Sequence, residues 1–246
     1  MSPLPPPYTD PDHLETALRR DGYVIVRPGV LASWLPHGLA GLQALQPSWD
    51  DLPPDTYLRD GGRYRRRRHS CFVVEGPRVD VVPHRAHWQP LEYNALHGGL
   101  ERWFSPMQPQ VVDSSVWSAL LQRLGALCST SAPEVARWYV EAHQFRIDTS
   151  DGIGRPTPEG AHRDGVDFVA ILLVGRHAIK GGETRVFEAE GPRGLRFMLT
   201  EPWTLLLLDD ARVIHETTPI QPLDAAGGHR DTLVVTFRAG GFQGPA

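Results

Sequence analysis

A histidine and an aspartate stand two positions apart in the stretch GAHRDGVDF, residues 160–168. If this stretch is extended, His162 and Asp164 point to the same side, because alternate residues of a strand share one face. They could then offer an imidazole nitrogen and a carboxylate oxygen to one metal ion. A His-x-Asp tripeptide arises often by chance, so a metal site requires a further ligand from elsewhere in the chain.

A second histidine, His215, lies about fifty residues later in RVIHETTPI, residues 212–220. Two histidines and one carboxylate on one face leave the opposite coordination positions open, which is the ligand set of non-haem Fe(II) oxygenases. In such an enzyme a co-substrate and dioxygen occupy the open positions. The three residues together predict a catalytic iron centre.

Arg230 and Thr232 supply what 2-oxoglutarate would need as that co-substrate. Arginine binds carboxylates bidentately, so Arg230 can hold the carboxylate that is remote from the iron. Thr232 faces the same side of the predicted strand and can add a hydroxyl donor. A protein that only binds a metal has no use for this pair, so the series favours an enzyme over a structural or metal-free barrel.

Seven short predicted strands after Pro133 position these residues. Turns such as GIGRP and EGPRG separate them, and the strands themselves are rich in apolar and β-branched residues. Many short strands without interleaved helices indicate a sandwich or barrel. The predicted strands span residues 137–147, 167–175, 183–190, 195–201, 203–210, 212–220 and 231–239.

The N-terminal half is predicted to be mostly helical. Asp10 can cap a helix over residues 11–20 that begins with Pro11, and residues 111–131 repeat apolar side chains at helical spacing. A strand over 22–29, a helix over 31–45 and an irregular stretch over 47–112 complete this half. We therefore expect one α+β domain over residues 1–246, consisting of an extended arm (1–11), a mostly helical and irregular support (12–132) and a β core (133–240).

The composition is that of a globular protein with a weak net charge of −4, which predicts no attraction to nucleic acid. No apolar run approaches the roughly 18 to 20 residues that a membrane span needs, and the start MSPLPPPYTD lacks the pattern of a secretory signal. Cys71 and Cys128 fit neither a disulfide framework nor a thiolate metal site. We expect a cytoplasmic protein with a small-molecule substrate and no nucleic-acid or membrane partner. The sequence predicts no particular oligomeric state.

Four motifs carry a family resemblance: GAHRDGVDFVAILLV, GGETRVF, LLLLDDARVIHETTPI and HRDTLVVTF. They resemble bacterial 2-oxoglutarate/Fe(II) dioxygenases that hydroxylate free L-amino acids, such as the isoleucine and leucine hydroxylases, over about residues 137–240. The resemblance implies a double-stranded β-helix (jelly-roll, cupin-like) core, with iron at His162, Asp164 and His215 and 2-oxoglutarate at Arg230. It also implies hydroxylation of an sp3 carbon with consumption of O2 and release of succinate and CO2, ascorbate serving as the reductant in vitro. An aspartate at position 164, rather than Gly or Ala, argues against a halogenase.

Two further groups of polar residues are candidate substrate contacts. Gln144 and Arg146 share one face of the strand over 137–147, and they would lie near the iron if that face forms the barrel interior. The alternative is a solvated outer face. The resemblance extends loosely to RYRRRRH (63–69). With strand-like alternation, one face of this stretch could turn an arginine toward a substrate carboxylate while the other is solvated, but the pattern does not indicate which arginine. Its alternatives are an ion-pair network and, less consistent with the weak acidic charge, a nucleic-acid patch.

The remaining polar residues of interest have no partner at ligand spacing. His143, on the opposite strand face from Gln144, is expected in a core or helix interface. Asp209 or Asp210 could orient His215, or could simply form a turn. The other histidines are expected to be packed or solvated: His69, His84, His87, His97, His177 and His229.

Several alternatives to amino-acid hydroxylation stay open. The same iron chemistry could act on another small metabolite in natural-product biosynthesis, and desaturation or cyclisation would look identical in sequence. A non-catalytic, metal-binding cupin-like protein would keep the barrel. A hydroxylase of nucleic acid or protein would be expected to show a basic surface or an extended recognition domain.

Overall fold

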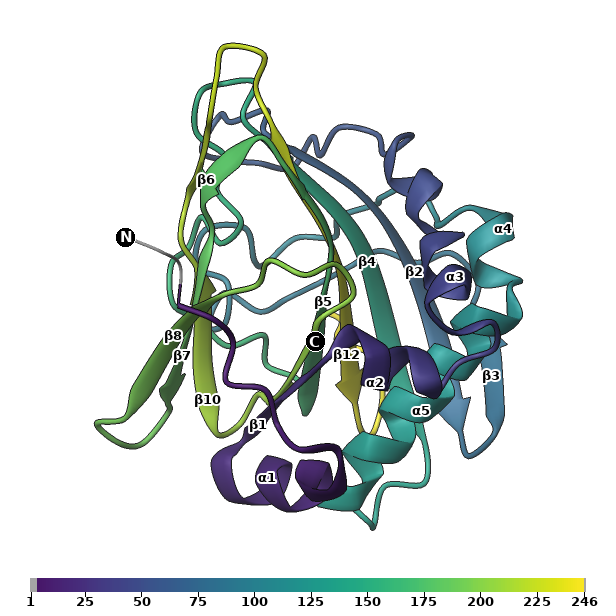
Figure 1. The fold of residues 1–246 in the computed structure, drawn as a ribbon. Helices are drawn as coiled ribbons and strands as arrows, with labels where there is room; N and C mark the ends of the chain where they lie inside the picture. The colour runs from purple at the N-terminus through teal and green to yellow at the C-terminus, as the bar shows by residue number, and fades with distance from the viewer. Residues whose placement is uncertain (1–3, 246) are drawn as a thin grey trace.

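Antiparallel strands dominate the computed structural model, which describes residues 4–245 (Figure 1). In chain order the strands are β1 (Tyr23–Val26), β2 (Arg65–Glu75), β3 (Arg78–Val81), β4 (Trp138–Asp148), β5 (Phe168–His177), β6 (Ile179–Gly181), β7 (Glu183–Glu188), β8 (Gly194–Met198), β9 (Leu205–Asp209), β10 (Val213–Thr217), β11 (Ile220–Pro222) and β12 (His229–Arg238). They form a seven-stranded main sheet in the order β1-β9-β5-β12-β4-β2-β3, a three-stranded minor sheet in the order β10-β7-β8, and the pair β11-β6. All pairs are antiparallel.

The two larger sheets pack against each other through apolar side chains. Val169, Ile171 and Leu173 of β5 lie in one buried cluster with Val186 of β7 and Val213 of β10. The sequence of β5, FVAILLV, is a continuous apolar run because both faces of the strand are covered. Two facing antiparallel sheets confirm the predicted double-stranded β-helix core.

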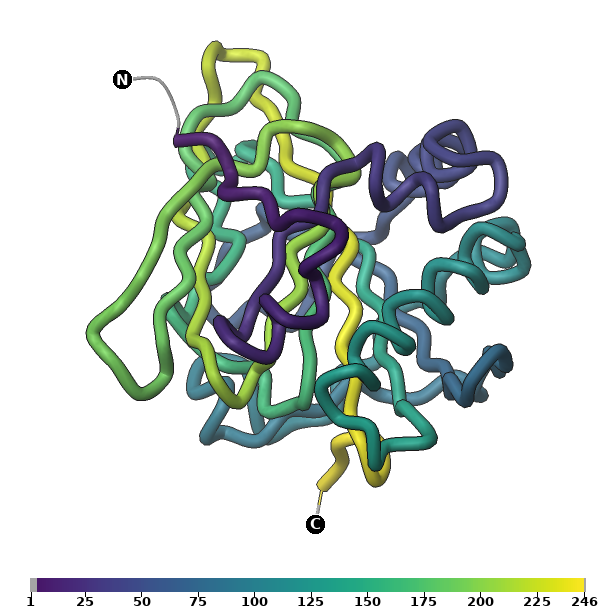
Figure 2. Tube along the Cα trace, turned by 60° about the horizontal axis from the view of Figure 1, so that its bottom comes forward, coloured from purple at the N-terminus to yellow at the C-terminus, as the bar shows by residue number. Residues whose placement is uncertain are grey.

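Helices cover the other face of the main sheet (Figures 1 and 2). They are η1 (Pro11–His13), α1 (Leu14–Asp21), α2 (Pro28–Ser33), α3 (Gly38–Gln43), η2 (Gln46–Trp49), α4 (Pro109–Val112) and α5 (Ser115–Ser131). The Ser114 hydroxyl caps α5 by accepting a hydrogen bond of 3.2 Å from the backbone N–H of Trp117. The apolar face of α5 packs with Ala170 and Leu172 of β5, so the helical layer and β core share one interior.

The predicted α+β class, the strands after Pro133 and the helix expected over residues 111–131 are confirmed, the last as α5. The interpretation of residues 47–112 as irregular is wrong for residues 65–81, because β2 is an eleven-residue strand of the main sheet and β3 pairs with it. The N-terminal half also contributes β1 and β3, so it is part of the sheet as well as its support. The single helix expected over 31–45 is two short helices, separated at His37, which adopts a left-handed φ of 61°.

No helix within residues 4–245 is long and apolar enough to cross a membrane.

Candidate active site

Three side chains converge where the segment ahead of β5 meets β10. His162 and His215 exchange two backbone hydrogen bonds of 3.0 Å as an isolated bridge. His162 Nε2 lies 3.8 Å from Asp164 Oδ1, and His215 Nε2 lies 3.8 Å from Asp164 Oδ2. One ligand atom from each residue lies within 4.8 Å of the other two. The structure thus brings the three predicted metal ligands together, and their nitrogen and oxygen donors suit Fe(II).

The two imidazole rings present Nε2 to this point. His162 Nδ1 donates to the carbonyl oxygen of Gly160 at 2.9 Å, so Nε2 is the ring atom that a proton or a metal ion can occupy. Burial opposes a charge on His162, yet the carboxylates of Asp164 and Glu159 outweigh it and raise the pKa of His162. Burial and the neighbouring His162 hold the pKa of His215 well below its usual value. His215 is therefore neutral, which is the metal-binding form.

Two residues that lie outside the ligand triad hold Asp164 in place. Gln89 Nε2 donates to Asp164 Oδ1 at 3.2 Å. Asp210 Oδ1 accepts a hydrogen bond of 3.0 Å from the backbone N–H of Asp164. The structure therefore gives Asp210 a role in orienting the loop that carries Asp164, instead of orienting His215. Gln89 was not a sequence candidate, because nothing in its surroundings marks a contact 75 residues away.

Arg230 and Thr232 line the same cavity from β12. The Arg230 side chain is buried, and within residues 4–245 its Nε and Nη2 have no hydrogen-bond partner. Burial and the nearby Arg176 guanidinium lower the pKa of Arg230 to about 9. A buried guanidinium with two unpaired nitrogen donors requires an anion, and the far carboxylate of 2-oxoglutarate fits that requirement.

The arginine-rich stretch turns two of its side chains into this cavity. Arg65 and Arg67 alternate with Arg66 and Arg68 along β2, and only the first two line the cavity. Arg65 Nε donates to the buried Asp55 at 2.7 Å. Alternation along a strand is expected for this stretch, but the sequence does not indicate which face turns inward, and the structure turns Arg65 and Arg67 inward.

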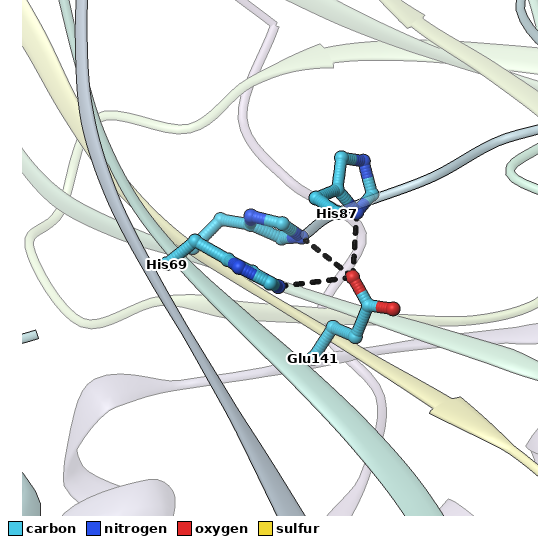
Figure 3. Close-up of side chains that lie close together, drawn as sticks. His69, His87 and Glu141 are labelled. Carbon is cyan, nitrogen blue, oxygen red and sulfur yellow. Dashed lines mark hydrogen bonds and ion pairs between the residues drawn. The ribbon is translucent and has the colours of Figure 1, made fainter. Parts of the chain in front are cut away.

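Three histidines that the sequence left without partners lie together beside the cavity, around Glu141 (Figure 3). Glu141 Oε2 lies 3.0 Å from His69 Nε2 and 2.5 Å from His87 Nδ1. His143 stacks on His69 with ring centroids 4.6 Å apart. His143 is buried, as a core position predicts, but it lies on the cavity-facing side of β4 with Glu141 and not at a helix interface.

Gln144 and Arg146 point away from this cavity. Gln144 Nε2 donates to the Ser48 hydroxyl at 2.7 Å, under the helical layer. Arg146 forms two hydrogen bonds of 2.8 Å with the buried carboxylate of Asp231. The assumption that their face is the barrel interior is wrong, since β4 instead turns its odd-numbered residues inward.

Comparison with known proteins is consistent with this geometry. The family model described as 2OG-Fe dioxygenase matches residues 46–236. A crystal structure of a BsmA homologue from Methylobium petroleophilum PM1 is 53% identical, covers 97% of each chain and superposes with a TM-score of 0.91. No curated protein matches the sequence.

Two more distant structures share the fold. IDO from Bacillus thuringiensis is 16% identical, with a TM-score of 0.77, over 95% of this chain and 97% of its own. The Fe(II)/α-ketoglutarate-dependent dioxygenase TqaL is 21% identical, with a TM-score of 0.68, over 93% of this chain and 86% of its own. The family match spans most of the chain and includes the converging His, Asp and His side chains and the buried Arg230. The chain therefore belongs to the 2OG-Fe dioxygenase family and is an iron- and 2-oxoglutarate-dependent dioxygenase.

Proposed function

We propose that this enzyme hydroxylates an sp3 carbon of a free L-amino acid, with His162, Asp164 and His215 as the iron ligands and with Arg230 and Thr232 holding 2-oxoglutarate. The observation that carries the proposal is the position of the three ligand atoms in one cavity with the buried guanidinium of Arg230, whose Nε and Nη2 have no hydrogen-bond partner among residues 4–245. A metal-binding protein without catalysis would leave that guanidinium without a counter-ion. Burying the charged Arg230 side chain would then cost free energy that no interaction offsets.

The residues of this chain act by binding and orientation. Iron, 2-oxoglutarate and O2 together supply the oxidising power, as 2-oxoglutarate is converted to succinate and CO2. Gly160 and Gln89 fix the directions of His162 and Asp164, and Arg230 fixes the far end of the co-substrate. No side chain of the protein needs to act as a general acid or base. The main task of the cavity is to hold one C–H bond of the substrate at the iron.

The charge of the cavity supports a substrate with a carboxylate. Arg65, Arg67 and Arg102 are all buried along one wall, whereas the carboxylates beside them are those of Asp55 and Glu141. Small metabolites other than amino acids also carry carboxylates, and desaturation or cyclisation would use the same iron site. A free amino acid additionally carries an ammonium group, for which the cavity offers carboxylate partners.

Succinate formation tests this proposal. Enzyme with Fe(II), ascorbate and 2-oxoglutarate is given each proteinogenic L-amino acid, citrulline and ornithine in turn. We expect one or a few of them to stimulate succinate formation, and mass spectrometry to show a product that is 16 Da heavier, the mass of one added oxygen atom. His162→Ala and Arg230→Ala should abolish both signals, whereas Arg78→Ala, at an exposed arginine of β3, should not. Iron binding that survives His162→Ala unchanged would contradict the ligand assignment.

A further inference from the structure

We propose that Arg67, Arg102 and Glu141 form the subsite for the head group of a free α-amino acid, with the two guanidiniums binding the carboxylate and Glu141 binding the ammonium. This inference deepens the proposed function and rests on it. All three side chains line the cavity that contains the predicted iron ligands. Each is less than a tenth exposed, so each is held by the fold and shielded from bulk water.

The protein pairs these two buried guanidiniums incompletely. Asp55 pairs with Arg65 at 2.7 Å and lies at 3.8 Å from Arg67, so its charge is already committed. Arg102 Nη2 donates at 2.8 Å to Gln89, whose side-chain amide is neutral. Within the described part of the chain, Nε of Arg67 and Nε of Arg102 have no hydrogen-bond partner. Buried, incompletely paired guanidiniums require an anion, and a carboxylate matches their planar fork.

Glu141 is prepared to bind a cation. Its Oε2 is the atom close to both His69 and His87. The neighbouring His143 is neutral. The guanidinium of Arg67 can only donate, so His143 Nδ1, which lies 2.6 Å from Arg67 Nη2, must accept that hydrogen bond. The hydrogen bonds that the Glu141 carboxylate makes within residues 4–245 go to Oε2, so Oε1 has no partner there, and the side chain lines the cavity. Neighbouring His87 and His69 lower the pKa of Glu141 despite its burial, so the carboxylate is ionised.

The subsite lies at a useful position relative to the iron. Gln89 bridges the two, because its Oε1 accepts from Arg102 and its Nε2 donates to Asp164 Oδ1. A carboxylate bound at Arg102 is therefore separated from an iron ligand by one side chain.

A second metal ion is the competing interpretation, since His69, His87, Glu141 and His143 offer ligand atoms within 4.8 Å of one another. Three observations disfavour it. The Arg67 contact directs the single proton of His143 to Nε2, the atom that would have to bind the metal. The 2.5 Å between His87 Nδ1 and Glu141 Oε2 is a hydrogen-bond distance, shorter than the separation of about 3 Å between two ligands of one tetrahedral ion. A dication would also lie beside the buried Arg67.

Equilibrium binding under anaerobic conditions tests the subsite without turnover. The probes are the proteinogenic L-amino acids, their N-acetyl derivatives and their amides, titrated into enzyme loaded with Fe(II) and 2-oxoglutarate. The wild type should bind at least one free amino acid and should bind its N-acetyl derivative and its amide at least about 30-fold more weakly, because each derivative leaves one buried charge unpaired. Equal binding of free and N-acetylated forms, or no binding of any free amino acid, would overturn the subsite.

Glu141→Gln is nearly isosteric and isolates the ammonium contact. It should weaken the free amino acid by about 30-fold and leave the N-acetyl form unchanged, whereas Arg102→Met should weaken both. Affinity for Fe(II) and 2-oxoglutarate, measured in the same samples, should stay within about threefold of the wild type for Glu141→Gln. A wild type that did not bind Fe(II) and 2-oxoglutarate would contradict the proposed function itself. Failure of the amino-acid subsite alone would leave that binding intact, so the two results are distinguishable.

Glu159→Gln is the matched control, because Glu159 is the other glutamate lining the cavity and lies 3.5 Å from His162. A selective loss of free amino acid binding in Glu159→Gln, but not in Glu141→Gln, would transfer the ammonium site to Glu159 and overturn the assignment. Metal analysis completes the test. A second equivalent of Zn²⁺ or Fe(II) that His87→Asn removes would show that the Glu141 cluster is a metal site.

Discussion

The carboxylate of Asp210 accepts a hydrogen bond of 3.0 Å from the backbone N–H of Asp164. Its other oxygen accepts from the N–H groups of Gly165 and Val166, at 2.8 and 3.2 Å. Gly165 has a φ of 74°, and an added Cβ there would collide with the ring of Tyr93. The fully buried carboxylate of Asp210 lies in the turn before β10. It therefore fixes the loop that carries His162 and Asp164 relative to β10, which carries the third predicted ligand, His215.

Asp210→Asn should weaken Fe(II) binding by about 10- to 100-fold, the range seen when a residue that orients metal ligands is lost. An asparagine keeps one acceptor oxygen but points an NH2 group at backbone N–H donors. Anaerobic Fe(II) titration measures the effect, and circular dichroism checks the fold. Asp209→Asn, in the neighbouring position, should change the affinity by less than about threefold. Equal effects of the two substitutions would contradict a specific role for Asp210.

Arg230→Met should raise the KM for 2-oxoglutarate by about 30-fold or more. The substitution keeps an unbranched apolar stem but removes the guanidinium, so the far carboxylate of the co-substrate is left buried without a cation, which costs about 2 kcal/mol or more. Arg230→Lys restores a charge without the planar fork and should give an intermediate KM. Initial rates of succinate formation provide the measurement. An unchanged KM in Arg230→Met would place 2-oxoglutarate elsewhere in the cavity.

The convergence of the three predicted iron ligands could be anticipated from the sequence because their geometry is nearly local. His162 and Asp164 are two positions apart, and His215 lies in a strand that the flanking apolar runs and turns delimit. The pairing of β10 with the segment ahead of β5 then follows from the jelly-roll arrangement. The position of Arg230 could be anticipated in the same way, because Arg230 lies at the start of β12.

The other wall of the cavity could not be predicted, because β2 carries charges on both faces. Its inward Arg65 and Arg67 and its outward Arg66 and Arg68 produce no apolar alternation. The buried charge of the inward arginines needs partners such as Asp55. Asp55 lies in a different segment of the chain and contacts Arg65 of β2. Cross-strand register places His69 opposite His143, and no spacing within the sequence reports it.

The stability of the fold should decline with acid below about pH 6.5. Burial lowers the pKa of His87 to about 3, against the effect of Glu141, while the unfolded chain titrates near 6.5. Between these values the unfolded state binds a proton that the folded state does not, so the free energy of unfolding falls as the pH falls. His87 alone contributes a slope approaching about 1.4 kcal/mol per pH unit. Glu141, with its lowered pKa, adds a loss in the same direction below about pH 4.5.

Urea unfolding of the wild type and His87→Gln at pH 7.5, 6.5, 5.5 and 4.5 measures this contribution. His87→Gln should be less stable at pH 7.5, but its free energy of unfolding should fall less steeply from pH 6.5 to 4.5. The slope is the informative quantity, since a lost hydrogen bond lowers stability equally at every pH. Parallel curves for the two proteins would show that His87 does not remain neutral in the folded state.

Arg146→Ala should lower stability and leave substrate binding unchanged, because Arg146 lies outside the cavity. Its guanidinium makes two hydrogen bonds of 2.8 Å to the buried carboxylate of Asp231. Removing one partner of a fully buried ion pair costs about 3 to 5 kcal/mol, and the partial exposure of Arg146 reduces the expected loss to about 2 kcal/mol. Urea unfolding and the KM values for amino acid and 2-oxoglutarate are measured on the same preparation.

Arg66→Ala is the matched control for this substitution. Arg66 is paired with Arg146 in the register of β2 and β4, but it is more exposed and lies 3.8 Å from Asp148. An exposed pair at that distance should contribute less than about 1 kcal/mol. A raised KM for the amino acid in Arg146→Ala, with stability unchanged, would return Arg146 to the substrate site and contradict the inward direction of the odd-numbered residues of β4.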